Sequence, residues 1–367
     1  MMAGVDPELS RPEHPYEAQA DGETTSAVSE GPQVDLFWRT WTSPKDGKTD
    51  RENEDAVRVT VGGAGTGRLW CAAVADGATG AIYSALWART LVAAAEPDWP
   101  ELDDARLTAR LDAVRGSFSP LSSAGDIPWF ARDKYLLVGS QATLLVATLR
   151  LLPDGDRLSL RAAGVGDSCV LVIRSTGEVE PFPVESSTDF GVDPALVRER
   201  AQPSLPYRRW ETTIDHGDIV LACTDAVAAW CLRRVEAGEG SGLVQTLLDL
   251  VAPSGEDSPV AVSLGSGGDH DAEAADGTAE LPPPLDAFGR FLARWRSAGS
   301  QPRMRNDDAT LALLVPVRAT DTSVERDAAE TLQRLGAGGA FSVTRRTAMS
   351  DSTVSASASG GPPAQEG

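Results

Sequence analysis

Short apolar runs that begin or end at an acidic residue constrain this sequence more than any other feature. Four of them are 57–61 after Glu54 and Asp55, 69–75 before Asp76, 218–223 before Asp225, and 310–317 after Asp307 and Asp308. Runs of this length and composition are typical of buried β-strands. The sequence therefore predicts a sheet-rich domain whose strands carry carboxylates at their ends.

The remaining segments predict how this sheet is covered. Further strands are expected at 142–151, 158–163 and 169–174, and an opening strand around the aromatic residues Phe37, Trp38 and Trp41. Apolar residues at helical spacing predict helices over 79–95, 101–115, 226–236, 242–252 and 286–298, and allow one over 323–335 that would pack on the body or stay separate. Strands and helices in this order favour a layered α+β domain over an alternating βαβ fold.

The net charge of -21 is concentrated outside this domain. Residues 1–35 hold eight acids and one base, and residues 254–285 hold seven acids and neither Lys nor Arg. Both stretches, and 347–367, are too poor in large apolar residues to offset the entropy lost on ordering. We expect a disordered acidic tail at 1–35, a domain at 36–317 with a disordered insert at 254–285, and a C-terminal tail at 318–367.

Composition also excludes several classes of function. No cluster of basic residues suits a nucleic-acid or anionic-membrane partner, and no apolar run is long enough to span a membrane. The N-terminus does not resemble a signal peptide. The four cysteines form no CxxC pair, so reduced, buried thiols are expected. Together these features predict a cytoplasmic protein.

The acids at the strand ends suggest a metal site. Carboxylates gathered at one edge of a sheet repel one another unless a cation neutralises them. Oxygen-only ligands suit Mg²⁺ or Mn²⁺, and no His or Cys belongs to the group of acids, which disfavours zinc and copper. Taken singly, each acid is more often a turn residue than a ligand, so the case depends on the whole set in its order.

Six segments, in chain order, resemble the motifs of one enzyme family. They are Asn53-Glu54-Asp55, Ala75-Asp76-Gly77, Gly139-Ser140-Gln141-Ala142-Thr143, Gly164-Val165-Gly166-Asp167-Ser168, Gly217-Asp218 with Thr224-Asp225-Ala226, and Asp307-Asp308-Ala309-Thr310. Over about residues 36–317 the chain is similar to the metal-dependent protein Ser/Thr phosphatases of the 2C type (the PPM family), as a divergent, bacterial-like member.

The resemblance implies a fold, a reaction and a set of ligands. The fold would be a four-layer α-β-β-α sandwich of two antiparallel sheets with flanking helices. Two divalent cations, Mg²⁺ or Mn²⁺, would share Asp76 and activate a bridging water that hydrolyses phosphoserine or phosphothreonine on proteins. The expected ligands are Asp76, the carbonyl of Gly77, Asp225 and Asp307, with Glu54 or Asp55 supporting the second ion. The metal-bound water, and no side chain, would be the nucleophile.

Several positions depart from the family pattern. Asp50 stands where the family has a phosphate-binding arginine, so Arg51 is the candidate for that role, although an ordinary solvated arginine explains it equally well. Thr79 replaces a glycine beside the site, and Ala226 replaces another. These departures keep an alternative open, in which the chain is a non-catalytic phosphatase-like module that binds a protein or phosphopeptide.

Overall fold

The computed structural model describes ten stretches of the chain: 34–63, 68–118, 129–191, 193–200, 202, 205–251, 286–297, 299, 303–318 and 324–344, with the side chains of 129–131 left out. The chain divides into two units at Gly31 and Pro32, and every described residue belongs to the second. The acidic insert at 254–285, and the N-terminal tail up to residue 33, lie outside the described residues. Val34 and Asp35, expected in that tail, instead begin a strand.

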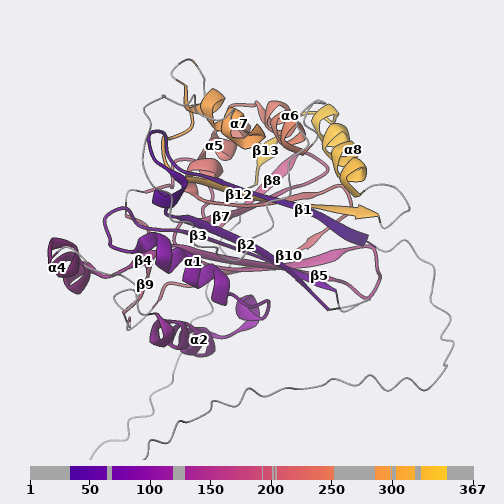
Figure 1. Ribbon diagram of the computed structural model, residues 1–367. Helices are drawn as coiled ribbons and strands as arrows, with labels where there is room; N and C mark the ends of the chain where they lie inside the picture. The colour runs from indigo at the N-terminus through magenta and orange to yellow at the C-terminus, as the bar shows by residue number, and fades with distance from the viewer. Residues whose placement is uncertain are drawn as a thin grey trace, which may run out of the picture. The chain divides into compact units, whose positions relative to one another are not determined.

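Two sheets carry the fold (Figure 1). The first has the order β1 (Val34–Ser43), β12 (Ala309–Arg318), β11 (Ile219–Cys223), β7 (Cys169–Ile173), β8 (Glu178–Phe182) and β13 (Ser342–Val343). The second has the order β10 (Arg208–Ile214), β6 (Leu158–Val165), β5 (Leu144–Leu151), β3 (Leu69–Asp76) and β2 (Asp55–Gly62). The strands pair antiparallel, except that β13 runs parallel to β8. A separate short pair joins β4 (Gln141–Ala142) to β9 (Val197–Arg198).

Helices cover the outer face of each sheet. The first sheet is covered by α5 (Asp225–Glu236), α6 (Gly240–Val251), α7 (Ala287–Arg296) and α8 (Val324–Ala337), and the second by α1 (Ser84–Ala94) and α2 (Asp104–Ser117). The described part of the chain also holds α4 (Trp129–Val138) and two short 3-10 helices, η1 (Asp50–Glu52) and η3 (Trp99–Glu101). The predicted layered α+β class is therefore confirmed, with four layers in the order α-β-β-α.

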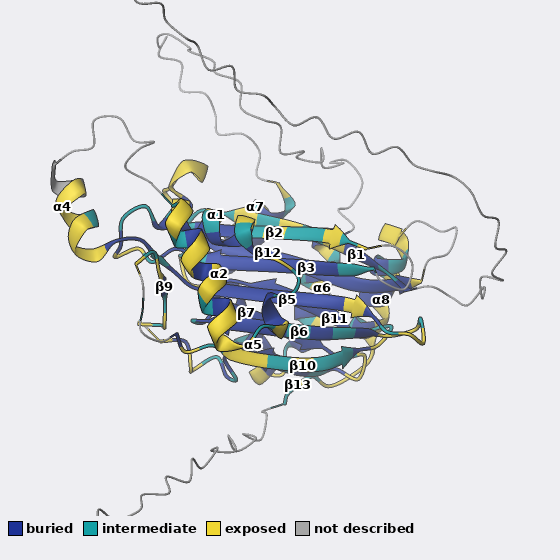
Figure 2. Ribbon diagram, turned by 90° about the horizontal axis from the view of Figure 1, so that it is seen from below, coloured by how far each residue is buried: buried dark blue, intermediate teal, exposed yellow. Residues whose placement is uncertain are grey.

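Alternating side chains fill the layers between these elements. Along β3, Trp70, Ala72 and Val74 point between the sheets, whereas Cys71 and Ala73 point toward α1 and α2. Since successive residues of a strand face opposite ways, a strand apolar on both faces is buried on both faces. Figure 2 shows the central strands buried along most of their length. None of the described helices is long and apolar enough to cross a membrane.

Two differences from the predicted elements bear on the site. The helix expected over 79–95 begins only at Ser84, because 79–83 form turns and Tyr83 has a left-handed backbone with φ of 56°. The strand expected over 142–151 is interrupted at Thr143, which lies between β4 and β5. Both differences lie next to Asp76: residues 79–83 follow it along the chain, and Thr143 accepts a hydrogen bond from its amide.

Candidate metal-binding site

The pairing of β2 with β3 brings two of the predicted acids together. Asp55 and Asp76 are direct partners in the antiparallel register, so their side chains lie on the same face. Asp76 has the same parity along β3 as Trp70 and Val74, which point between the sheets. Asp55 is buried, and one of its oxygens, Oδ1, has no hydrogen-bond partner. The second sheet therefore ends in a pair of carboxylates that face the first sheet.

The first sheet supplies the next acid through Thr224. This residue follows β11, and its hydroxyl donates to Asp55 Oδ2 at 2.8 Å and accepts from the Thr310 amide at 3.0 Å. Thr224 is also the N-cap of α5, so Asp225 becomes the first residue of that helix. A helix N-terminus favours negative charge, which helps to hold a carboxylate there. Asp225 is buried, and it reaches the site from the opposite sheet to Asp55.

Asp308 holds two loops in place. Its Oδ1 accepts from the Lys45 amide at 2.8 Å and its Oδ2 accepts from the Glu54 amide at 2.7 Å. With both oxygens engaged by backbone donors, Asp308 positions the segments that carry Glu54 and Asp307. Arg296, which is buried at the end of α7, donates to the carbonyl of Asp307 and so fixes the same segment from the other side.

Burial and mutual repulsion raise the pKa of these acids. For Asp76 the largest cause is burial, followed by the charges of Asp55 and Asp225, and its pKa lies well above the ordinary value. Burial likewise raises the pKa of Asp55. Burial also raises the pKa of Asp225, and the charge of Asp307 raises it further. The pKa of Glu54 is raised by burial, against hydrogen bonding from Thr79. A cluster that resists ionisation in this way gains free energy when a cation binds it.

Asp167, which stands in one of the six family-like segments but was not among the expected ligands, belongs to the same group. It is buried, its Oδ1 has no hydrogen-bond partner, and burial followed by the charge of Asp225 raises its pKa to about 7. Asp167 follows β6 after one glycine, so it too is an acid just beyond a strand end. The same pattern that selected Asp76 and Asp225 was therefore available to select it.

Position 77 requires its glycine, and the two residues that replace a family glycine, Thr79 and Ala226, fit their places. A Cβ at Gly77 would lie 2.8 Å from the Glu54 carbonyl oxygen and 2.9 Å from Ser84, so only glycine fits there. Thr79 hydrogen-bonds Glu54, which gives this replacement a polar contact at the site. Ala226 is the second residue of α5 and has no positive φ. Alanine at 226 therefore costs nothing in backbone strain.

Two basic side chains contact the predicted ligands. Lys45 Nζ lies 3.9 Å from Glu54 Oε2 and 3.8 Å from Asp307 Oδ1, and Arg305 Nη1 lies 3.3 Å from Asp225 Oδ2. Neither was selected from the sequence. Arg51, the predicted phosphate-binding residue, lies exposed in η1 and makes no ion pair with these acids within the described part of the chain.

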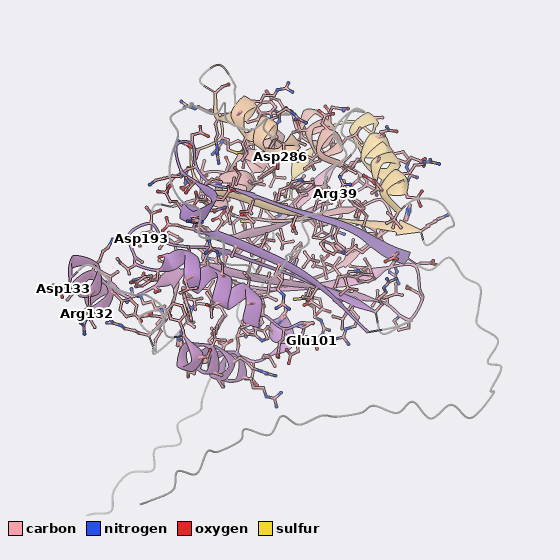
Figure 3. All side chains as sticks on the ribbon, viewed as in Figure 1. Arg39, Glu101, Arg132, Asp133, Asp193 and Asp286 are labelled. Atoms are coloured by element: carbon pink, nitrogen blue, oxygen red, sulfur yellow. The ribbon has the colours of Figure 1, made fainter. Side chains whose placement is uncertain are left out.

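One further acid and the four cysteines are not part of this group. Asp133, the acid that comes before the Gly139–Thr143 segment, is exposed on α4, as Figure 3 shows. The four cysteines are free and buried, as predicted, and burial raises the pKa of Cys71 to about 11 and that of Cys231 to about 12. Thiols that stay protonated in the core are poor metal ligands and poor nucleophiles.

The donor set suits a hard divalent cation. Oxygen atoms alone form it, and two buried carboxylate oxygens, Asp55 Oδ1 and Asp167 Oδ1, are without partners. As these side chains stand, no three acids, histidines or cysteines in the described segments are close enough to form a metal-binding group. Lys45 and Arg305 lie against three of the carboxylates and keep part of the site in ion pairs. The chemistry of the residues therefore fits a cation.

Comparison with known proteins gives similarity at the level of solved structures. No protein-family model matches the chain, and no curated protein matches it. The solved structures that match include a serine/threonine phosphatase of Streptococcus agalactiae, at 14% identity over 76% of this chain and 99% of that one, with a TM-score of 0.44. Stp1 of Staphylococcus aureus matches at 13% identity over 76% of this chain and 94% of that one, with a TM-score of 0.41. PstP/Ppp of Mycobacterium tuberculosis matches at 15% identity over 76% of this chain and 98% of that one, with a TM-score of 0.38.

Proposed function

We propose that this chain is a metal-dependent phosphatase that hydrolyses phosphoserine or phosphothreonine on proteins. The observation that carries the proposal is the pairing of Asp55 with Asp76 at the end of one sheet, joined through Thr224 to Asp225 at the end of the other. Buried carboxylates with raised pKa values and unpartnered oxygens reduce the free energy of unfolding, and such groups cluster at functional sites.

The cations would be held by the carbonyl of Gly77 and by five side chains: Glu54, Asp55, Asp76, Asp225 and Asp307. Asp167 joins them in this proposal, because it is buried beside Asp225. Two bound Mg²⁺ or Mn²⁺ ions would supply a water activated at neutral pH and would offset charge on the phosphoryl oxygens.

The protein's own part is to hold these groups rigidly. Asp308 accepts a hydrogen bond from the Glu54 amide, and Thr224 donates one to Asp55 Oδ2. The other oxygen of Asp55, Oδ1, is left without a partner. Thr143 accepts from the Asp76 amide at 3.0 Å and is hydrogen-bonded to Ser168 at 2.6 Å, next to Asp167. Preorganised charges of this kind lower a barrier without rearranging during the reaction.

The test is release of phosphate from a phosphothreonine peptide with Mn²⁺, with Mg²⁺ and with a chelator. We expect release that needs the cation and falls at least about 100-fold in Asp225→Asn, which keeps the side chain's size but removes its charge. Asp133→Asn, exposed on α4, is the matched control and should behave as wild type.

The result separates an enzyme from a binding module. Folded wild-type protein that binds Mn²⁺ but releases no phosphate from serine or threonine peptides would contradict the proposal. It would favour the alternative of a phosphatase-like module that only binds its partner. Release from small phosphomonoesters but not from peptides would keep the chemistry and overturn the substrate class.

A further inference from the structure

We propose that Lys45 and Arg305 together bind the phosphate group of the substrate, in the role for which Arg51 was the sequence candidate. This inference rests on the proposed function, because it concerns the substrate of that same site. Both side chains approach the carboxylate cluster, Lys45 through Glu54 and Asp307 and Arg305 through Asp225. A phosphate drawn to the cluster by cations would lie within reach of both.

The loop that carries Lys45 is held by three hydrogen bonds with two residues, Asp308 and Arg296. Its backbone amide donates to Asp308, and the preceding carbonyl, that of Pro44, accepts from Arg296 Nη1 at 3.1 Å. The following residue, Asp46, accepts a further bond from Arg296 Nη1 at 3.0 Å. The loop is thus held on both sides of the lysine. A rigid backbone that carries a flexible ammonium suits a ligand that arrives after the site has formed.

Arg305 reaches the cluster from the other side. Its Nη1 contacts Asp225, its Nη2 lies 3.5 Å from the carbonyl of Phe190, and 42% of its side chain remains exposed. The preceding residue, Met304, is buried, and its amide donates to the Trp295 carbonyl at 2.9 Å. These ion-pair and hydrogen-bond distances are long, so the guanidinium is held near the site by weak bonds that a phosphate can replace.

The charge of the site requires such cations. The acids grouped here are Glu54, Asp55, Asp76, Asp167, Asp225, Asp307 and Asp308. Seven ionised carboxylates outweigh two divalent cations, so the loaded site alone would still repel a phosphomonoester dianion. Lys45 and Arg305 offset two of these negative charges at the site itself. Arg51 is exposed in η1 and has no contact of this kind among the described residues.

The test measures binding of inorganic phosphate to the Mn²⁺-loaded full chain, by calorimetry and by broadening of the phosphate ³¹P resonance. Lys45→Met and Arg305→Met should each weaken phosphate binding about tenfold, since each removes a charge-assisted contact. Lys45→Arg and Arg305→Lys should recover most of the affinity. Arg326→Met, an exposed position on α8, is the matched control and should bind as wild type.

A second readout separates phosphate binding from metal binding. Titration with Mn²⁺ alone should show affinity in Lys45→Met that is equal to or tighter than wild type, because the ammonium no longer competes for Glu54 and Asp307. Loss of Mn²⁺ affinity in that variant would overturn the assignment and make Lys45 a support of the ligands.

The decisive comparison is with Arg51→Met. Weaker phosphate binding in Arg51→Met, with wild-type binding in both Lys45→Met and Arg305→Met, would overturn the proposal. So would a loaded wild-type protein that binds no phosphate. Protein that binds phosphate through Lys45 and Arg305 but hydrolyses no peptide would contradict the proposed function and leave this inference standing.

Discussion

Asp55 is the residue at which burial and charge conflict most directly. It is almost fully buried, its Oδ2 accepts from Thr224, and its Oδ1 has no partner. Burial raises its pKa, and the charges of Asp308 and Asp225 add to the effect. A residue in this position destabilises the folded chain when it is ionised, unless a cation neutralises it.

Asp55→Asn should therefore stabilise the protein in the presence of a chelator, by about 1–2 kcal/mol in the free energy of unfolding. The amide keeps an oxygen to accept from Thr224 but carries no charge. Urea unfolding with chelator measures the change, and Asp133→Asn, on the exposed face of α4, should lie within about 0.5 kcal/mol of wild type. A chelated variant less stable than wild type would show that Asp55 is held by contacts other than those described.

Gly166 is the residue that lets the chain turn from β6 to Asp167. Its φ is +97°, and a Cβ there would lie 2.6 Å from Thr143 Cγ2 and 2.8 Å from the Ala195 carbonyl oxygen. Gly166→Ala should cost about 3 kcal/mol or more in the free energy of unfolding, from strain and overpacking together.

Gly155 separates those two causes. It also has a positive φ, +76°, but a Cβ there would meet nothing within 4 Å. Gly155→Ala should cost only the backbone strain, about 1–2 kcal/mol. Equal losses in the two variants, measured by urea unfolding, would mean that Thr143 and Ala195 move aside and that contact at Gly166 contributes nothing.

At the scale of elements, strands that are apolar on both faces could be predicted from the sequence, whereas the edge strand β10 could not. The runs for β3, β5, β11 and β12 are apolar on both faces, because both faces of these strands are covered. β10, an edge strand with the sequence RRWETTI, has mostly exposed or half-buried residues and no apolar run. Single-sequence patterns register burial, so an edge strand that buries little gives little signal.

The helix predicted at the C-terminal end packs on the body. In α8, Ala328 and Leu332 are buried in the core that also holds α5 and α6, and Arg39 of β1 pairs with Glu325 on this helix. Leu332→Ala should cost about 2–4 kcal/mol, measured as the shift in urea unfolding. Glu330→Ala, on the exposed side of the same helix, is the control. A loss under about 1 kcal/mol at Leu332 would mean that α8 adds little to the core.

At the scale of the whole molecule, the site depends on both sheets meeting at one end. The sequence could place acids at strand ends, but it could not show that Asp55 pairs with Asp76 or that Thr224 joins the sheets, because those contacts depend on register and packing. It missed Asp167 although that acid also stands just beyond a strand end, because a Gly-Asp pair is typical of an ordinary turn. It missed Lys45 and Arg305 because no local sequence pattern shows which carboxylates a basic side chain will contact in the folded chain.

The central claim is that this end of the sandwich binds divalent cations, and calorimetric titration with Mn²⁺ tests it most directly. Wild-type protein should bind two ions per chain. Asp76→Asn removes the charge of the residue that the two ions would share, so this variant should lose most of that binding while remaining folded. Wild-type protein that takes up no Mn²⁺, or an Asp76→Asn variant that binds it as tightly, would contradict the account.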